Sequence, residues 1–210
     1  MNLYTVKPGK HYFKGNKFQF AYVQYALLLI GVILGISIGN WWYTIGAIVI
    51  FFTIAIFLSD KTKINSSRIY FYPNCKYQLS ENYGQVNKLF GFSEGFHHWN
   101  SARIGWRCTD GEFIELMAYA YIDGVRAIKP MIKCKVESWV FCSIQNKSSK
   151  YVFKALTPNN QSITVSIDKG KKISIYSFFK LFTYKLFPYF GGKIAAPHKM
   201  DLCITKLRLQ

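Results

Sequence analysis

Apolar positions are distributed unevenly along this chain, and their longest run lies near the N-terminus. Residues 21–58 contain no Asp, Glu, Lys or Arg. A membrane-spanning helix needs about 20 apolar residues, so the run has the length of two crossings joined by a turn. Gly39 and Asn40 tolerate the backbone of such a turn, and the aromatic residues that follow are typical of a helix end at the lipid headgroups. The pattern therefore predicts a transmembrane helical hairpin over residues 18–60. Its two helices are predicted at about 21–38 and 41–58.

Basic residues flank this run on both sides, while its central connection carries no charge. Because cytoplasmic loops carry an excess of Lys and Arg, we expect a multi-pass protein of the bacterial inner (cytoplasmic) membrane with both termini cytoplasmic. A secretory signal peptide is the alternative, since Ser37 and Gly39 have the spacing of a cleavage site. The second apolar segment that follows directly favours the hairpin.

Three glycines, Gly31, Gly35 and Gly39, repeat at every fourth position of the first predicted helix. Such a face lets a neighbouring backbone approach closely. Two interpretations stay open. The glycines seat the second helix of the same hairpin, or they join several chains into a homo-oligomer.

The chain is predicted to begin with a short basic leader, residues 1–17. The hairpin follows, and then a domain over residues 65–210 that is also basic. The chain has 27 Lys and Arg against 10 Asp and Glu, a formal net charge of +17. A basic domain fits either the anionic surface of a membrane leaflet or an anionic ligand such as a nucleotide or nucleic acid. The five cysteines contain no CxxC pair and suit buried thiols better than a disulfide framework.

From Arg68 onward, short runs rich in Ile, Val, Tyr, Phe and Trp alternate with turn signals such as Asp110-Gly111 and Asp123-Gly124. This texture is typical of an all-β fold. The predicted fold class is therefore a membrane-anchored all-β protein, in which the hairpin precedes a cytoplasmic antiparallel β-sandwich or barrel. Strands are predicted near residues 68–72, 76–79, 101–109, 112–122, 125–129, 132–136, 138–144, 151–155, 162–168 and 200–207, and residues 176–189 fit a strand or a short helix.

The two strands around the first of these turns give the clearest candidate site. Alternation places Arg103 and Arg107 on one face of the first strand, opposite its apolar side. If Tyr119 and Tyr121 share that face, it offers charge-assisted donors beside aromatic rings, which suits a phosphate attached to a base. The alternative is that Glu115 pairs with an arginine across the strands and the face is simply solvated.

A glycine-containing loop just upstream carries two adjacent histidines, His97 and His98, followed by Asn100. These three residues are assigned to contacts with the ligand. The histidines have no partner at metal-ligand spacing, so we expect no metal and no cofactor. The sequence also lacks a nucleophile with its base, a P-loop and a pair of closely spaced carboxylates, which indicates a protein that is not an enzyme.

An aromatic stretch with Pro188 and Gly191-Gly192 precedes the last predicted strand, and His198 lies between this stretch and the strand. Its aromatic side chains, with Lys193 and His198, line the mouth of a barrel or plug the end of a sandwich, and the sequence does not choose between these arrangements.

Two resemblances extend this picture. In its layout, a transmembrane hairpin followed by a basic β-domain, the chain resembles the two-transmembrane β-domain effectors of bacterial anti-phage defence. That resemblance implies that a cyclic nucleotide binds the β-domain, drives association and lets the helices disrupt the inner membrane. Separately, PYFGG at residues 188–192, with APH shortly before the last strand, resembles the closing segment of jelly-roll β-sandwiches of bacterial carbohydrate-active proteins.

The function predicted from these features is a membrane effector of antiviral defence. Its expected partners are membrane lipid, an anionic nucleotide and further copies of the chain. One alternative is a membrane-anchored scaffold that regulates a partner nuclease such as a CRISPR effector. The other is a carbohydrate-binding jelly-roll protein.

Overall fold

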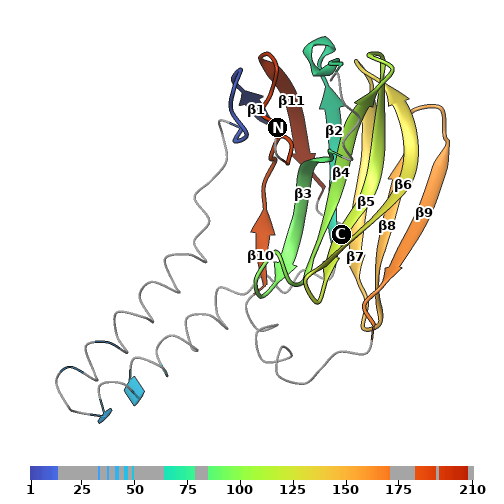
Figure 1. Ribbon diagram of the computed structural model, residues 1–210. Coiled ribbons are helices and arrows are strands. Elements are labelled where there is room, and N and C mark those ends of the chain that lie inside the picture. The colour runs from blue at the N-terminus through green and yellow to red at the C-terminus, as the bar shows by residue number, and fades with distance from the viewer. Residues whose placement is uncertain are drawn as a thin grey trace.

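The computed structural model describes residues 1–13, 64–78, 85–170, 183–192 and 194–207, together with seven single positions between 33 and 49. Within these residues the strands form two antiparallel sheets that lie face to face (Figure 1). The six-stranded sheet has the order β1-β11-β2-β7-β8-β9, and the five-stranded sheet has the order β10-β3-β4-β5-β6. The strands are β1 (Asn2–Val6), β2 (Ile64–Phe71), β3 (Asn87–Glu94), β4 (Ser101–Thr109), β5 (Phe113–Ile122), β6 (Val125–Lys135), β7 (Trp139–Asn146), β8 (Lys150–Leu156), β9 (Ser162–Asp168), β10 (Thr183–Leu186) and β11 (Met200–Lys206), with a short 3-10 helix at Pro73–Cys75.

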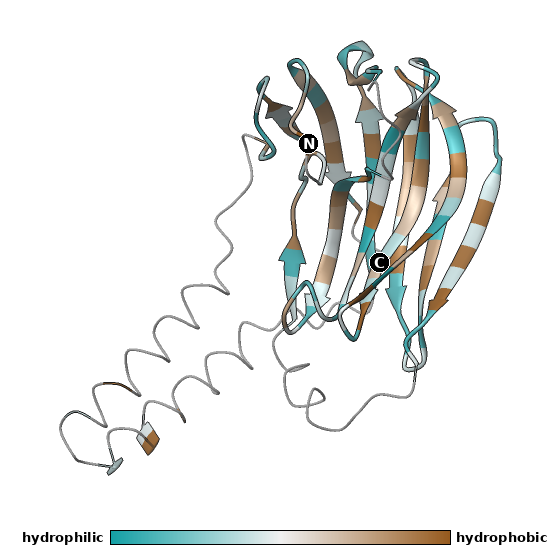
Figure 2. Ribbon diagram, in the orientation of Figure 1, coloured by the Kyte–Doolittle hydropathy of each residue, from teal (hydrophilic) through white to brown (hydrophobic). Residues whose placement is uncertain are grey.

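Alternating side chains fill the space between the sheets, as the banding along β9 illustrates (Figure 2). On β4, Ile104 and Trp106 are fully buried in the core, whereas Arg103, the residue before Ile104, lies on the opposite face of the strand. Phe71 of the opposite sheet packs against Trp106 with ring centroids 5.2 Å apart. Each such large side chain contributes about 1.5–3 kcal/mol when it is fully buried. The domain is therefore a β-sandwich rather than a closed barrel.

Both turn signals join antiparallel strands, but the two-residue turn predicted at Asp110-Gly111 is wrong, and only Asp123-Gly124 forms one. Asp123 and Gly124 both have positive φ, 48° and 82°, and Ile122 pairs directly with Val125 across this two-residue turn. Asp110 and Gly111 also have positive φ, but Thr109 pairs with Phe113, so that loop contains three residues rather than two.

The predicted transmembrane hairpin requires a correction. No helix among the described residues is both long and apolar enough to cross a membrane. The membrane-anchored fold class was wrong for the described chain, which is an all-β sandwich, and the inner-membrane location with cytoplasmic termini loses its support. The prediction rested on the apolar length of the run, but a span also requires a continuous helix of about 20 residues. Residues 18–60, apart from the seven single positions, and Gly31, Gly35 and Gly39 lie outside the described residues.

All five cysteines are free, and four of them are buried. Burial raises the pKa of the Cys142 thiol well above its usual range, and burial raises that of Cys134 to about 12. These thiols therefore act as small apolar core side chains.

Candidate functional site

The candidate site lies on the outer face of the five-stranded sheet, the face whose side chains point away from the core. Strand register places Arg103 of β4 opposite Tyr119 of β5, and Tyr119 opposite Ile128 of β6. The neighbouring row brings Tyr121 opposite Arg126. Because partners in antiparallel register share a face, Arg103, Tyr119, Tyr121 and Arg126 all belong to this surface. The prediction that Arg103 shares a face with the two tyrosines is thus met by the register.

Lys88 of β3 adds a further cation to the outer face. It pairs with Gly105 in the row next to Arg103, and its backbone also exchanges hydrogen bonds with Tyr189 in the segment after β10. The Lys88 Nζ donates a hydrogen bond of 2.9 Å to the carbonyl of Gly191. It lies 5.1 Å from the ring centroid of Tyr119 and 5.7 Å from that of Tyr189.

Arg103 lies against the sheet because Gly91 of β3, its register partner, has no side chain to displace it. A Cβ on Gly91 would lie 2.9 Å from the Cγ of Arg103. The guanidinium donates from Nη2 to the carbonyl of Phe187, while its buried Nε has no hydrogen-bond partner among the described residues. Burial lowers the pKa of Arg103 to about 10, an effect opposed by the nearby tyrosines, so the group stays charged at neutral pH.

Three cations on this face have no ion-pair partner among the described residues. They are Lys88, Arg103 and Arg126. Burial, followed by repulsion from Arg103 and Arg126, lowers the pKa of Lys88 to about 8. An unpaired, partly buried cation costs free energy, and an anion placed beside it would recover that cost.

A first aromatic cluster lies at the Arg126 end of these cations. The rings of His97 and His98 lie 4.1 Å apart, and His97 Nδ1 is 2.9 Å from the hydroxyl of Tyr184 on β10. His98 meets Tyr121 edge to face at 5.5 Å. Burial, followed by repulsion from His98 and Arg103, lowers the pKa of His97 to about 4, so this imidazole is neutral at pH 7.

A second aromatic cluster lies at the Lys88 end. The ring of Tyr189 stacks on His11 at 5.5 Å and meets Tyr12 edge to face at 5.1 Å. Tyr12 is 74% exposed, so its ring is available to a ligand. From Ser101 to Gly105, which mark the two outer rows on β4, the strand rises about 13 Å. The face therefore offers cations in three successive rows with aromatic rings at both ends.

Some of the residues predicted for the site have other roles. Arg107 donates from Nε to Glu115 at 2.7 Å, which is the cross-strand pair considered as the alternative. Asn100 is buried, and its side-chain oxygen accepts a hydrogen bond of 3.3 Å from the backbone N–H of Asp123. Tyr119 is only 3% exposed, so it supports Lys88 from below and cannot stack on a ligand.

The predicted site omitted Lys88 and Arg126, and the sequence placed Tyr184 and Tyr189 only in the aromatic closing stretch, apart from that site. Arg126 could have been found, because the two-residue turn at Asp123-Gly124 fixes its position opposite Tyr121. Lys88 lies on β3, a strand that the apolar pattern did not predict, and the two tyrosines come from the closing stretch.

The closing stretch has a divided role. Phe190 is fully buried against Tyr77 and Trp106, with ring centroids 5.4 Å and 6.3 Å away, so it fills one end of the sandwich. Its neighbour Tyr189 instead contributes to the outer face. His198 Nε2 lies 2.9 Å from the carbonyl of Asn74, away from the candidate site, and Lys193 lies outside the described residues.

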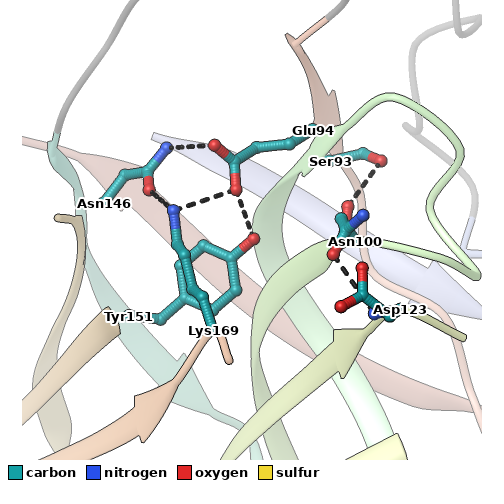
Figure 3. A network of polar contacts seen from close by, with 7 residues as sticks. All are labelled: Ser93, Glu94, Asn100, Asp123, Asn146, Tyr151 and Lys169. Atoms are coloured by element: carbon teal, nitrogen blue, oxygen red, sulfur yellow. Dashed lines mark hydrogen bonds and ion pairs between the residues drawn. The ribbon is translucent and has the colours of Figure 1, made fainter. Parts of the chain in front are cut away.

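A separate polar network joins the two sheets inside the sandwich (Figure 3). Glu94, at the end of β3, receives hydrogen bonds from Tyr151 and, at 3.1 Å, from Asn146. Lys169 donates to Glu94 at 3.0 Å and also to Asn146. Glu94 is 8% exposed and Lys169 is 2% exposed, so this is a buried ion pair. Because its donors and acceptors satisfy one another, we regard it as structural.

Comparison with known proteins assigns the chain to no family. No protein-family model matches the chain, and no curated protein matches it. Among solved structures, an alginate lyase from Klebsiella pneumoniae is similar at 9% identity and a TM-score of 0.47, over 69% of this chain and 59% of that one. A xylan β-1,4-xylosidase from Bacillus halodurans shares 10% identity at a TM-score of 0.40, over 66% of this chain and 26% of that one. CG-16, a homodimeric agglutinin from chicken liver, shares 7% identity at a TM-score of 0.29, over 70% of this chain and 89% of that one.

These TM-scores lie below 0.5, so the likenesses carry no argument about the site. Nothing in the comparisons bears on the resemblance to anti-phage effectors. The functional argument therefore rests on the outer face itself.

Proposed function

We propose that this protein binds an extended acidic saccharide, one with carboxylate or sulfate groups along its length, on the outer face of the five-stranded sheet. The observation that carries this proposal is the set of cations in three successive rows, Lys88, Arg103 and Arg126, none of which has an acidic partner among the described residues. Anionic groups repeated along a ligand would each meet a cation.

The aromatic rings support a saccharide as the backbone of that ligand. The exposed ring of Tyr12 and the partly exposed ring of Tyr189 lie beyond Lys88, and His98 and Tyr121 lie beside Arg126. Aromatic faces pack against the apolar C–H faces of sugar rings, while hydroxyl and imidazole groups supply hydrogen bonds to sugar hydroxyls. The three rows together span about 13 Å along β4. This span is longer than one monosaccharide, which favours an oligosaccharide.

Calorimetric titration of the full chain with tetragalacturonate tests the proposal. We expect Arg103→Met to weaken binding by about 10- to 100-fold, because a charge-assisted hydrogen bond contributes about 1.5–3 kcal/mol. The matched control is Lys154→Met, which removes one charge from an exposed position on β8 in the other sheet and should leave the affinity unchanged.

Two further ligands sharpen the result. Neutral cellotetraose should bind much more weakly than tetragalacturonate, and added salt should reduce the affinity for the acidic ligand. Equal loss of binding in the Arg103 and Lys154 variants would contradict the site. Binding of cyclic di-AMP in place of tetragalacturonate would show that the anion is a nucleotide and would contradict the saccharide.

A further inference from the structure

Lys88 is held in a way that simple binding of an anion does not require. Two aromatic rings, those of Tyr119 and Tyr189, and the carbonyl of Gly191 fix its Nζ in one place. The side chain nevertheless remains partly exposed. A primary amine that is both immobilised and accessible meets the geometric requirement for attack on a carbonyl carbon.

The groups that act on this amine come from β4, β5 and β6 and from the segment after β10. They are Arg103 on β4, Tyr119 on β5, Arg126 on β6 and Tyr189 after β10. Burial and the two arginines lower the pKa of Lys88 to about 8, so about a tenth of this amine is neutral at pH 7. Tyr119 stays protonated because burial raises its pKa. The free amine is thus available at neutral pH beside a guanidinium that attracts anions.

We propose that Lys88 is a nucleophilic amine that forms an imine with an anionic carbonyl compound, such as a 2-oxo acid or the open-chain aldehyde of an acidic saccharide. The Nζ lone pair of the neutral amine attacks the carbonyl carbon, and the carbonyl π electrons move to oxygen. The two amine protons pass in turn to that oxygen, which leaves as water while the nitrogen lone pair forms the C=N bond. The step consumes no oxidant or reductant. Arg103 holds the anionic group of the reactant. The inference rests on the proposed function because it uses the same face, but it does not require a long ligand.

Labelling of the full chain with pyridoxal 5′-phosphate, an anionic aldehyde, tests this inference. Borohydride reduction fixes the imine, and peptide mass spectrometry gives the rate at each lysine. At pH 7 we expect Lys88 to react at least about tenfold faster than exposed Lys154, because a lowered pKa leaves more free amine. The rate at Lys88 should reach half its maximum near pH 8. A rate no greater than that of Lys154, or one that rises without a plateau to pH 10, would overturn the proposal.

Two variants separate this chemistry from binding. Arg103→Met should slow labelling of Lys88 by pyridoxal 5′-phosphate more than labelling by neutral glyceraldehyde. Equal slowing would contradict the role given to Arg103. Lys88→Arg should remove the label while keeping the charge, and the site-resolved pH profile of the wild type decides the matter if that variant does not fold. Reactive Lys88 without tetragalacturonate binding would contradict the proposed function alone, whereas binding without reactive Lys88 would contradict this inference alone.

Discussion

Individual side chains on the outer face titrate according to their neighbours, and His97 gives the clearest prediction. Burial, His98 and Arg103 lower its pKa to about 4 from an ordinary value near 6.5. Between pH 4 and 6.5 the unfolded chain therefore binds a proton that the folded chain does not. The free energy of unfolding should fall as the pH decreases through this window and should stop responding to His97 above it. Urea unfolding of wild type and His97→Gln at several pH values measures this, and the variant should show a shallower slope.

The glutamine in this variant keeps a hydrogen-bonding group near the Tyr184 hydroxyl, so the slope reports on charge more than on lost contacts. His198→Gln is the control, since His198 lies against Asn74, away from the outer face. That variant should retain the wild-type slope. An unchanged slope in His97→Gln would show that His97 does not titrate in the way its surroundings indicate.

At the scale of single strands, the sequence predicted those elements whose own pattern is regular. β4 and β5 alternate cleanly around a turn, so their bounds and the common face of Arg103 and Tyr119 followed from period two. β3 was missed because its register shifts between Lys88 and Gly91, where consecutive Leu89 and Phe90 are both buried and the alternation breaks.

Two other elements departed from prediction for different reasons. Residues 125–135 form one strand, not two, because β6 is an edge strand that tolerates Pro130 beside a register shift. Residues 2–6 were assigned to an unpacked leader, yet they form β1 and pair with β11. That pairing joins the two ends of the sequence, and no local pattern predicts such a contact. The same limit hid Lys88, Tyr184 and Tyr189 from the predicted site.

The close approach of β3 to β4 makes Gly91→Ala a test at this scale. The added Cβ would lie 2.0 Å from the carbonyl oxygen of Ala102 and 2.7 Å from the Cα of Arg103, so one strand must move. We expect a loss of about 1–3 kcal/mol in the free energy of unfolding, together with weaker tetragalacturonate binding as Arg103 is displaced. Chemical denaturation and calorimetry measure the two effects.

Gly192→Ala is the matched control for this substitution, since a Cβ there meets nothing within 4 Å. It should change stability by no more than about 0.5 kcal/mol. If Gly91→Ala is as well tolerated as Gly192→Ala, then β3 and β4 are not held as closely as the register indicates.

For the whole molecule, the buried network of Glu94 and Lys169 links the two sheets in addition to their apolar core. Glu94 ends β3 in the five-stranded sheet, whereas Asn146, Tyr151 and Lys169 belong to or follow strands of the six-stranded sheet (Figure 3). Glu94→Gln would remove the carboxylate that the buried Lys169 ammonium contacts at 3.0 Å. We expect it to lower the free energy of unfolding by about 3–5 kcal/mol, measured by guanidinium denaturation.

Removing both charges should cost less than the two single losses combined, because Glu94→Gln with Lys169→Met leaves no buried charge unpaired. The surface pair of Lys199 and Asp201, 3.2 Å apart with Lys199 64% exposed, gives the comparison, and Lys199→Met should cost at most about 1 kcal/mol. A double variant whose loss equals the sum of the single losses would show that the two charges act independently. In that case each single loss comes from the other contacts of Glu94 and Lys169, with Tyr151 and Asn146, and not from the ion pair between them.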